Sequence, residues 1–295
     1  PFPLLTSRLI QERNFRMRKN MDDLEEEIEK IRQELEAKIS ILQDKLRIGS
    51  NNSSKNNTII PKVIIQFWDK ANSIPSDVKK CMESWESLKE EGYTYILFNE
   101  KSAREYISSN LKKEHLLAFD NCYHPAMKSD YFRLCYINYS GGMYVDSDDV
   151  YSGLKIDNYF INSKLKLQPL CYDLELNQMV ETQNFLNNDT QNKHWIYYFN
   201  NNPIISVPFN PIIGYALERA TNILLNIDHN NLPEIQSTTG PGNITASVVA
   251  ALLTSTFNDE IEILTDWEEL SKTIWFLSYR NDSRNWRISN CKIFN

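Results

Sequence analysis

From residue 59 onward, apolar stretches rich in β-branched residues alternate with stretches of helical length. The segment IIPKVIIQFW, residues 59–68, is a nearly continuous apolar run, which is typical of a strand buried on both faces. Further elements are expected as helices at 75–88, 102–110, 112–118 and 125–139 and as strands at 93–98 and 143–145. This alternation predicts an α/β domain with a mostly parallel sheet. Such sheets bind ligands at the carboxyl ends of their strands, where Trp68 and Asp146 are expected.

The composition supports a folded core and excludes several functions. Of 295 residues, 41% are hydrophobic and 12% aromatic, enough for a large domain of residues 59–295. A formal net charge of −7 argues against nucleic-acid binding, which needs clustered Lys and Arg, and against docking on anionic lipid. No apolar run approaches the roughly 18–20 residues of a membrane span. Because the chain begins at Pro1 rather than Met, a membrane tether upstream stays compatible with it.

Residues 1–49 are expected to form a coiled-coil stalk. Apolar side chains recur there at heptad spacing, with one stutter, at Met21, Leu24, Ile28, Ile31, Leu35, Ile39, Leu42 and Leu46. Homo-oligomerisation through this helix is the first interpretation, and an amphipathic helix folded back on the globular domain is the alternative. The segment 50–58, SNNSSKNNT, has no apolar residue and is interpreted as a flexible linker.

The five cysteines are widely spaced and form no CxxC pair. A zinc or thiol-redox site therefore has little support, and buried reduced thiols are expected. One disulfide is the alternative.

The strongest local signal is Asp146-x-Asp148, which follows the apolar strand at 143–145. Two carboxylates at a strand end offer the hard oxygen ligands that Mg²⁺ and Mn²⁺ prefer, while substrate phosphates fill the remaining positions. A solvated acidic loop is the alternative, and Asp149 is expected either to bind through water or to be solvated. On the preceding helix, Asp130 and Arg133 share one face because they are three residues apart. The alternative for this pair is a surface ion pair of little energetic weight.

Several spaced motifs carry a family resemblance. SDYFRLCYINYSGGMYVDSD, residues 129–148, resembles the sugar-binding DxD region of glycosyltransferase family 32 and is similar to the glucosyltransferase domain of large clostridial toxins. IPKVIIQFW resembles the first strand of that family, although Ile65 stands where many members have His. Ser84-Trp85 and YTYILFNE resemble the next helix and strand. The resemblance covers roughly residues 59–154 well and the remainder loosely.

The resemblance implies a GT-A fold and a metal-dependent, retaining glycosyltransferase. It would move a hexose or N-acetylhexosamine from a nucleotide sugar, with UDP favoured over GDP, to a glycan acceptor. One alternative is a toxin-like transferase that glycosylates protein side chains, and another is an inactive coiled-coil interaction protein. A stalk ahead of a DxD domain favours a membrane-tethered, Golgi-type lumenal enzyme, with a cytoplasmic bacterial or viral enzyme as the alternative.

The matched motif residues receive catalytic and metal-binding roles from this resemblance. Asp130 is expected to hydrogen-bond hydroxyls of the donor sugar, and Arg133 to contact the same sugar or the diphosphate. Asp146 is expected to bridge the ribose and the metal. Asp148 is expected to be the main protein ligand of Mn²⁺ or Mg²⁺.

Five further residues are expected to bind the nucleotide sugar. Trp68 would stack on the base with Phe67 beside it, and Tyr144 would pack on the ribose or base. Asn243 lies in STTGPGNIT, residues 237–245, which resembles the T-G-P segment that opens a helix beside the active site in the family. Trp286 belongs to the C-terminal segment, treated next.

The C-terminal segment departs from the family pattern. SYRNDSRNW lacks the expected His, and Tyr279 or Arg280 stands near its place. Closure over the diphosphate by Arg280, Ser283 or Trp286 is a hypothesis. The aromatic stretch 194–199, HWIYYF, is interpreted as a core or strand segment or as part of the acceptor site.

Overall fold

The structure is a computed structural model that describes residues 59–186, 192–228, 231–253, 260–282, 284, 285 and 287. The predicted stalk of 1–49 and the linker of 50–58 lie outside the described residues, as do Ser283, Trp286 and Cys291. Within the described ranges, no helix combines the length and apolar character needed to cross a bilayer.

The main sheet has seven strands within the described residues, in the order β2-β1-β3-β7-β5-β6, with β8 beside β5. These strands are β1 (Val63–Phe67), β2 (Thr94–Phe98), β3 (Gly142–Tyr144), β5 (Leu165–Asp173), β6 (Gln178–Val180), β7 (Trp195–Ser206) and β8 (Ile261–Ile263). β1 runs parallel to β2 and β3, and β8 runs parallel to β5. β7 is antiparallel to β3 and β5, and β6 is antiparallel to β5. The α/β class is confirmed, with the expected parallel pairing in the first three strands and antiparallel pairing through β7.

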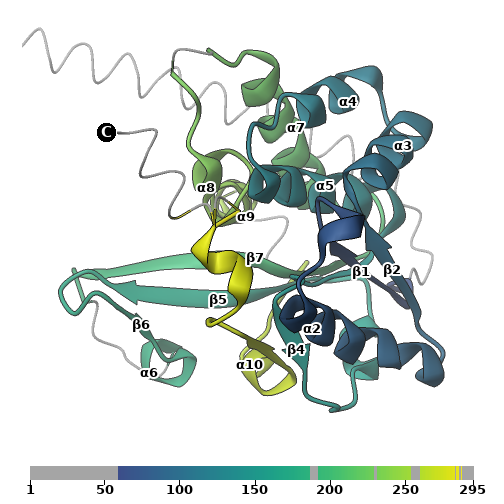
Figure 1. The fold of residues 1–295 in the computed structure, drawn as a ribbon. Helices are drawn as coiled ribbons and strands as arrows, with labels where there is room; N and C mark the ends of the chain where they lie inside the picture. Colours follow the sequence, from purple (N-terminus) through teal and green to yellow (C-terminus); the bar gives the residue numbers. More distant parts are fainter. Residues whose placement is uncertain are drawn as a thin grey trace, which may run out of the picture. The chain divides into compact units, whose positions relative to one another are not determined.

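Layers of helices and a small second sheet cover the main sheet. The helices are α2 (Ser76–Glu86), α3 (Glu100–Asn110), α4 (Lys113–Asp120), α5 (Pro125–Ser140), α6 (Thr182–Leu186), α7 (Pro211–Leu225), α8 (Ile235–Thr238), α9 (Pro241–Leu252) and α10 (Trp267–Leu270). Short 3₁₀ turns lie at 71–73, 87–91, 157–160 and 278–281. The second sheet pairs β4 (Asp149–Tyr151) antiparallel with β9 (Ser271–Thr273). In Figure 1, α3, α4, α5, α7 and α9 lie on one face of the main sheet, while α2, β4 and α10 lie on the other.

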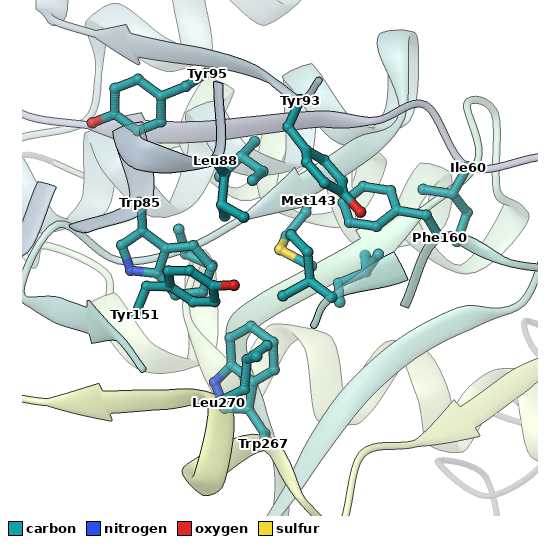
Figure 2. Packing of buried hydrophobic residues seen from close by; sticks show 14 of the residues in the cluster. Ile60, Trp85, Leu88, Tyr93, Tyr95, Met143, Tyr151, Phe160, Trp267 and Leu270 are labelled. Carbon is teal, nitrogen blue, oxygen red and sulfur yellow. The ribbon is translucent and has the colours of Figure 1, made fainter. Parts of the chain in front are cut away.

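An aromatic core packs between the main sheet and the layer that contains α2, β4 and α10 (Figure 2). Trp85 of α2 is fully buried and stacks on Trp267 of α10, with ring centroids 6.1 Å apart. The Trp85 indole Nε1 donates a hydrogen bond of 3.0 Å to the backbone oxygen of Asp149. The core therefore holds the chain directly behind the D-x-D motif in place.

Two glycines turn the chain from α5 into β3. Gly141 and Gly142 have φ angles of +67° and +106°, a region that disfavours side chains. A Cβ atom on Gly142 would lie only 2.7 Å from the backbone oxygen of Val63. The absence of a side chain thus lets β3 pair closely with β1, which brings Asp146 beside the end of β1.

The four described cysteines, Cys81, Cys122, Cys135 and Cys171, are buried and free. The expectation of reduced thiols is confirmed for these four. Residues 195–199 form the start of β7, so the interpretation of this aromatic segment as a strand is confirmed from Trp195 onward.

Candidate functional site

A cavity of about 1320 Å³ opens at the carboxyl ends of β1 and β3. Trp68 follows β1 and Asp146 follows β3, so both lie at the sheet edge that the strand order predicts. The structure brings seven of the expected site residues together in the wall of this cavity: Phe67, Trp68, Asp130, Arg133, Tyr144, Asp146 and Asp148.

Arg133 lies at the centre of the site and its side chain is almost fully buried. Its Nη2 atom is 2.9 Å from Oδ1 of Asp130 and 2.9 Å from Oδ1 of Asp146. Its Nη1 donates to the backbone oxygen of Asn201 at 2.7 Å, and the guanidinium lies 4.0 Å from the ring centroid of Tyr144. Burial alone would lower the pKa of Arg133, but Asp146, Tyr144 and Asp130 raise it. This buried junction excludes the surface-ion-pair interpretation.

Asp130 is buried beside Arg133 and bound by β7. Its Oδ1 accepts a hydrogen bond of 2.8 Å from Nδ2 of Asn201. Burial raises the pKa of Asp130 to about 6, against the opposing effect of Arg133. A Cβ atom on Gly240 would lie 3.2 Å from Oδ2 of Asp130, so the T-G-P segment at the start of α9 lies directly against this carboxylate.

Asp146 is the more exposed of the two D-x-D carboxylates. Its side chain is 32% exposed, compared with 13% for Asp148. Oδ1 of Asp146 accepts hydrogen bonds from Arg133 at 2.9 Å and from the Tyr144 hydroxyl at 3.1 Å. The Asp146 backbone N–H donates to Oδ1 of Asn202 at 3.0 Å. These contacts fix the carboxylate in position at the cavity wall.

Asp148 is held by the C-terminal segment. Its Oδ2 accepts a hydrogen bond of 2.7 Å from the Tyr279 hydroxyl and another from Nη2 of Arg280. Burial raises the pKa of Asp148, as does Asp146, while Arg280 opposes the rise. Tyr279 and Arg280, which stand near the place of the family's His, therefore reach the D-x-D motif.

Asp149 is buried, so the expectation that it is solvated is wrong. It is 1% exposed, and its carboxylate accepts hydrogen bonds of 2.9 Å from Asn202, 2.9 Å from Ser271 and 2.7 Å from Thr273. Burial raises the pKa of Asp149 to about 7, with added effects of Asp148 and Asp146. The side chain thus ties β4 to β7 and β9 instead of facing solvent.

Trp68 forms a wall of the cavity, although most of its ring is buried. Its ring meets Tyr279 edge-on at a centroid distance of 5.4 Å, and the Arg284 guanidinium lies 5.3 Å from its centroid. Among the described residues, the buried indole Nε1 has no hydrogen-bond partner, and neither does the buried Nε of Arg280. Unpartnered buried donors are uncommon in proteins, and a water, an ion or a ligand can satisfy them.

Asn243 does not join this group. It is fully buried within the helical layer, where its Nδ2 donates to the backbone oxygen of Ala216 at 2.9 Å and its Oδ1 accepts from Arg219 at 2.9 Å. Its neighbours Pro241 and Gly242 line the cavity instead. Trp286, the other expected nucleotide contact, lies outside the described residues.

Part of the chain is similar to a known protein family. Residues 75–166 match the family model described as a glycosyltransferase sugar-binding region containing a DXD motif. The resemblance to a DXD sugar-binding region of glycosyltransferases is confirmed for these residues. The match contains Asp130, Arg133, Asp146 and Asp148, and it ends within β5.

The chain is similar in sequence to a viral protein and has a weak structural likeness to a solved structure. An uncharacterized glycosyltransferase of Acanthamoeba polyphaga mimivirus is 29% identical over 93 residues, which are 31% of this chain and 37% of that protein. The match therefore spans little more than a third of that relative. Among solved structures, the PaToxG glycosyltransferase superposes with a TM-score of 0.38 and 15% sequence identity over 85% of this chain and 92% of that chain.

The donor set of the DXD region fits a hard divalent cation. Asp146 and Asp148 supply carboxylate oxygens, and Mg²⁺ commonly binds through one or two carboxylates with waters and substrate phosphates in its other positions. The described residues contain no group of three or more His, Cys, Asp or Glu side chains placed to hold a metal ion. The two carboxylates can therefore hold a cation when a diphosphate supplies further oxygen ligands.

Sequence reasoning missed the polar side chains that hold the DXD region in place. Asn201 and Asn202 of β7 bind Asp130, Asp146 and Asp149, although they are nearly fully buried in a strand. The sequence signal for these two residues is a run of three Asn before Pro203, within an otherwise apolar and aromatic stretch. Buried amides need partners, so such a run predicts charged groups opposite it.

Proposed function

We propose that the chain is a metal-dependent, retaining glycosyltransferase of GT-A fold. It transfers a hexose or N-acetylhexosamine from a UDP-sugar to a glycan acceptor. The observation that carries this proposal is the convergence of Asp130, Arg133 and the D-x-D carboxylates on one cavity at the carboxyl ends of β1 and β3. The DXD region and the mimiviral relative support the same class of enzyme.

The donor is held by side chains on both sides of the D-x-D motif. The flat ring of Trp68 offers a surface for the base. Its Nε1 has no partner among the described residues and offers a donor for a base or ribose oxygen. Asp130 presents Oδ2 next to the T-G-P segment, where it can accept hydrogen bonds from sugar hydroxyls. Arg133 keeps Asp130 and Asp146 in fixed positions and lowers the cost of burying their charge.

A divalent cation bound by Asp146 and Asp148 would supply Lewis-acid stabilisation of the leaving diphosphate. Arg280 donates from Nη2 to the Asp148 carboxylate and lines the cavity. Its buried Nε has no partner among the described residues, so the guanidinium can bind a diphosphate oxygen. The Tyr279 hydroxyl orients Asp148.

In the transfer, the bond between sugar C1 and the diphosphate oxygen breaks, and its electron pair leaves with the nucleoside diphosphate. A new bond forms between C1 and an acceptor hydroxyl on the same face of the sugar. The hydroxyl proton goes to the departing phosphate oxygen. In this mechanism, the residues of the chain bind and orient the two substrates and stabilise charge. None of the carboxylates in the described part of the cavity acts as a covalent nucleophile.

The first test is turnover of a panel of UDP- and GDP-sugars with Mn²⁺. We expect a UDP-sugar to bind and to be hydrolysed or transferred. Asp148→Asn is expected to lower kcat/KM at least about 100-fold, because loss of one charge-stabilising group in a transition state has about this effect. Asp146→Asn is expected to do the same. Asp120→Asn, a surface change on α4, is the matched control and is expected to leave kcat/KM within about twofold.

Two results would contradict the proposal. In the first, isothermal titration calorimetry detects no binding of any nucleotide sugar by the wild-type protein. In the second, Asp146→Asn and Asp148→Asn both retain wild-type turnover.

A further inference from the structure

The cavity continues past the D-x-D motif along one face of the β5–β7 ribbon, which reaches beyond the helices in Figure 1. Leu170 of β5 pairs with Tyr198 of β7, and Tyr172 pairs with Ile196. Side chains alternate across a strand, so positions two apart share a face. The face that lines the cavity, called the ribbon platform here, consists of Gln168, Leu170, Tyr172, Ile196, Tyr198 and Asn200.

The volume of the cavity leaves room for a second ligand. Pockets for one small molecule usually have about 300–1,000 Å³. This cavity has about 1320 Å³ and includes both the D-x-D end and the ribbon platform. A nucleotide sugar at the D-x-D end therefore leaves the space over the platform open to an acceptor.

The platform combines aromatic and apolar surface with a short chain of polar groups. Ile196 is 48% exposed, and the rings of Tyr172 and Tyr198 are partly exposed. Nδ2 of Asn200 donates to Oε1 of Gln168 at 3.1 Å, and Nε2 of Gln168 donates to Oε1 of Glu268 at 3.4 Å. The exposed Glu268 carboxylate is thereby positioned at the cavity wall, between the platform and the D-x-D end.

These features favour a sugar ring over a peptide. A pyranose has apolar C–H faces that pack on tyrosine rings, and hydroxyls that bind amides and carboxylates. One way in which an extended peptide binds is by pairing with an unpaired strand edge. The platform is a face of the ribbon and offers side chains: β5 pairs with β7, β6 and β8, whereas β7 pairs with β3 only at residues 204–206.

We infer that the ribbon platform binds a pyranose residue of the acceptor glycan, with Tyr172 and Tyr198 against the ring and Glu268 accepting a hydrogen bond from its hydroxyls. This inference rests on the proposed transferase function. It assigns the acceptor to the face of the ribbon, while the donor occupies the D-x-D end.

The test compares two tyrosines on opposite faces of one strand. Tyr197 is 50% exposed, does not line the cavity and packs against Phe185 and Trp195. Acceptors are p-nitrophenyl pyranosides of glucose, galactose, mannose and N-acetylglucosamine, with a Ser/Thr peptide as the competing class. Tyr198→Ala is expected to raise the pyranoside KM at least tenfold more than the donor KM. Tyr197→Ala is expected to leave both within twofold.

A binding measurement separates this inference from the function on which it rests. In saturation-transfer difference NMR, the C–H protons of a pyranoside are expected to receive saturation from the wild-type protein and to lose most of it in Tyr198→Ala. Glu268→Gln, on an exposed side chain, serves as the second variant if Tyr198→Ala does not fold. It is expected to raise the pyranoside KM at least fivefold.

Three results would overturn the inference: no pyranoside binds the wild-type protein, transfer goes only to the peptide, or the platform variants bind pyranosides as the wild type does. If a UDP-sugar is still hydrolysed although no pyranoside binds, or although the platform variants bind pyranosides as the wild type does, the proposed function survives and the acceptor site lies elsewhere. Transfer only to the peptide would contradict the glycan acceptor of the proposed function as well. If no nucleotide sugar binds, the proposed function itself fails.

Discussion

At the scale of single residues, Arg133 decides the chemistry of the site. One buried guanidinium contacts Asp130, Asp146 and the β7 backbone, so it balances two carboxylates that would otherwise repel each other. Removing one partner of a buried ion pair is far more costly than breaking a surface pair, because it leaves an uncompensated charge. Asp130 and Asp146 therefore depend on Arg133 for their positions, and Arg133 also lowers the pKa of Asp130 against the effect of burial.

Arg280 gives a prediction that does not depend on turnover. Its guanidinium lies on Asp148, one of the two proposed metal ligands, and competes with a cation for that carboxylate. Arg280→Ala is expected to strengthen Mn²⁺ binding by about tenfold without nucleotide, which corresponds to about 1.4 kcal/mol. Arg104→Ala, whose guanidinium pairs with Asp120 on the surface, is the control and should not change the affinity.

Electron paramagnetic resonance of free Mn²⁺ measures this affinity directly. An unchanged or weaker affinity in Arg280→Ala would show that Arg280 does not compete with the cation.

Much of the site is predictable at this scale because its residues lie close together in sequence. Asp130 and Arg133 are three apart on one helix, and Asp146 and Asp148 flank one residue after a strand. Asn201 is different: its hydrogen bond to Asp130 joins positions 71 residues apart, and only the antiparallel pairing of β7 with β3 brings them together. Asn243 is expected from the sequence to bind the nucleotide sugar, but it lies on the face of α9 that packs against α7 and donates there to the backbone of α7.

At the scale of elements, the α5–β3 turn sets where the D-x-D motif lies. Gly142 and Gly153 both have positive φ, but only Gly142 has a backbone atom of another strand against the position of its missing Cβ. Gly153→Ala therefore measures the conformational cost alone, about 1–2 kcal/mol. Gly142→Ala adds the clash with Val63 and is expected to lower the free energy of unfolding by clearly more than Gly153→Ala.

Urea denaturation of the two variants checks this prediction. Equal losses in Gly142→Ala and Gly153→Ala would mean that β3 can shift away from β1 without cost.

A partly buried histidine, His115, joins α4 to α5 and α7 and makes stability depend on pH. Nδ1 of His115 lies 3.1 Å from both the Tyr131 hydroxyl and Oγ1 of Thr221. Burial lowers the pKa of His115, helped by Lys112. The unfolded chain takes up this proton below about pH 6.5 while the folded protein does not, so stability from this group falls as pH drops from about 6.5 through the lower folded pKa.

We expect His115→Gln to flatten the dependence of the unfolding free energy on pH between about 7 and 5. Asn222→Gln, an exposed change on α7 that removes no titratable group, is the control and should leave the slope unchanged. Urea titrations at several pH values give both slopes, and an unchanged slope in His115→Gln would contradict the assignment.

At the scale of the whole molecule, the sequence predicts two parts with different roles. The strand–helix alternation from residue 59 identified the α/β class and the order of the first elements, because local periodicity reports local structure. It did not reveal that β7 runs antiparallel or that β9 pairs with β4, since these pairings join distant segments. The predicted stalk of 1–49 lies outside the described residues and stays a prediction.

Truncation tests the predicted division of the chain into a stalk and a globular domain. A chain of residues 59–295 is expected to fold, to bind the donor and to be monomeric, while the full chain is expected to be an oligomer through the heptad segment. Light scattering after size exclusion gives the masses, and circular dichroism shows folding. Loss of folding in 59–295 would place the domain boundary elsewhere, and a monomeric full chain would contradict the coiled coil.

The hydrogen bond between Asp149 and Thr273 joins residues that are 124 positions apart. The site can therefore be complete only after both residues have been added during protein synthesis. At about 5–20 residues per second, a ribosome adds the β9 residues roughly 6 to 25 s after the D-x-D motif. During that interval the nascent chain has its D-x-D motif but lacks Ser271, Thr273, Tyr279 and Arg280, which hold Asp148 and Asp149. Premature termination before residue 271 therefore yields a product with the sequence motif and without an assembled site.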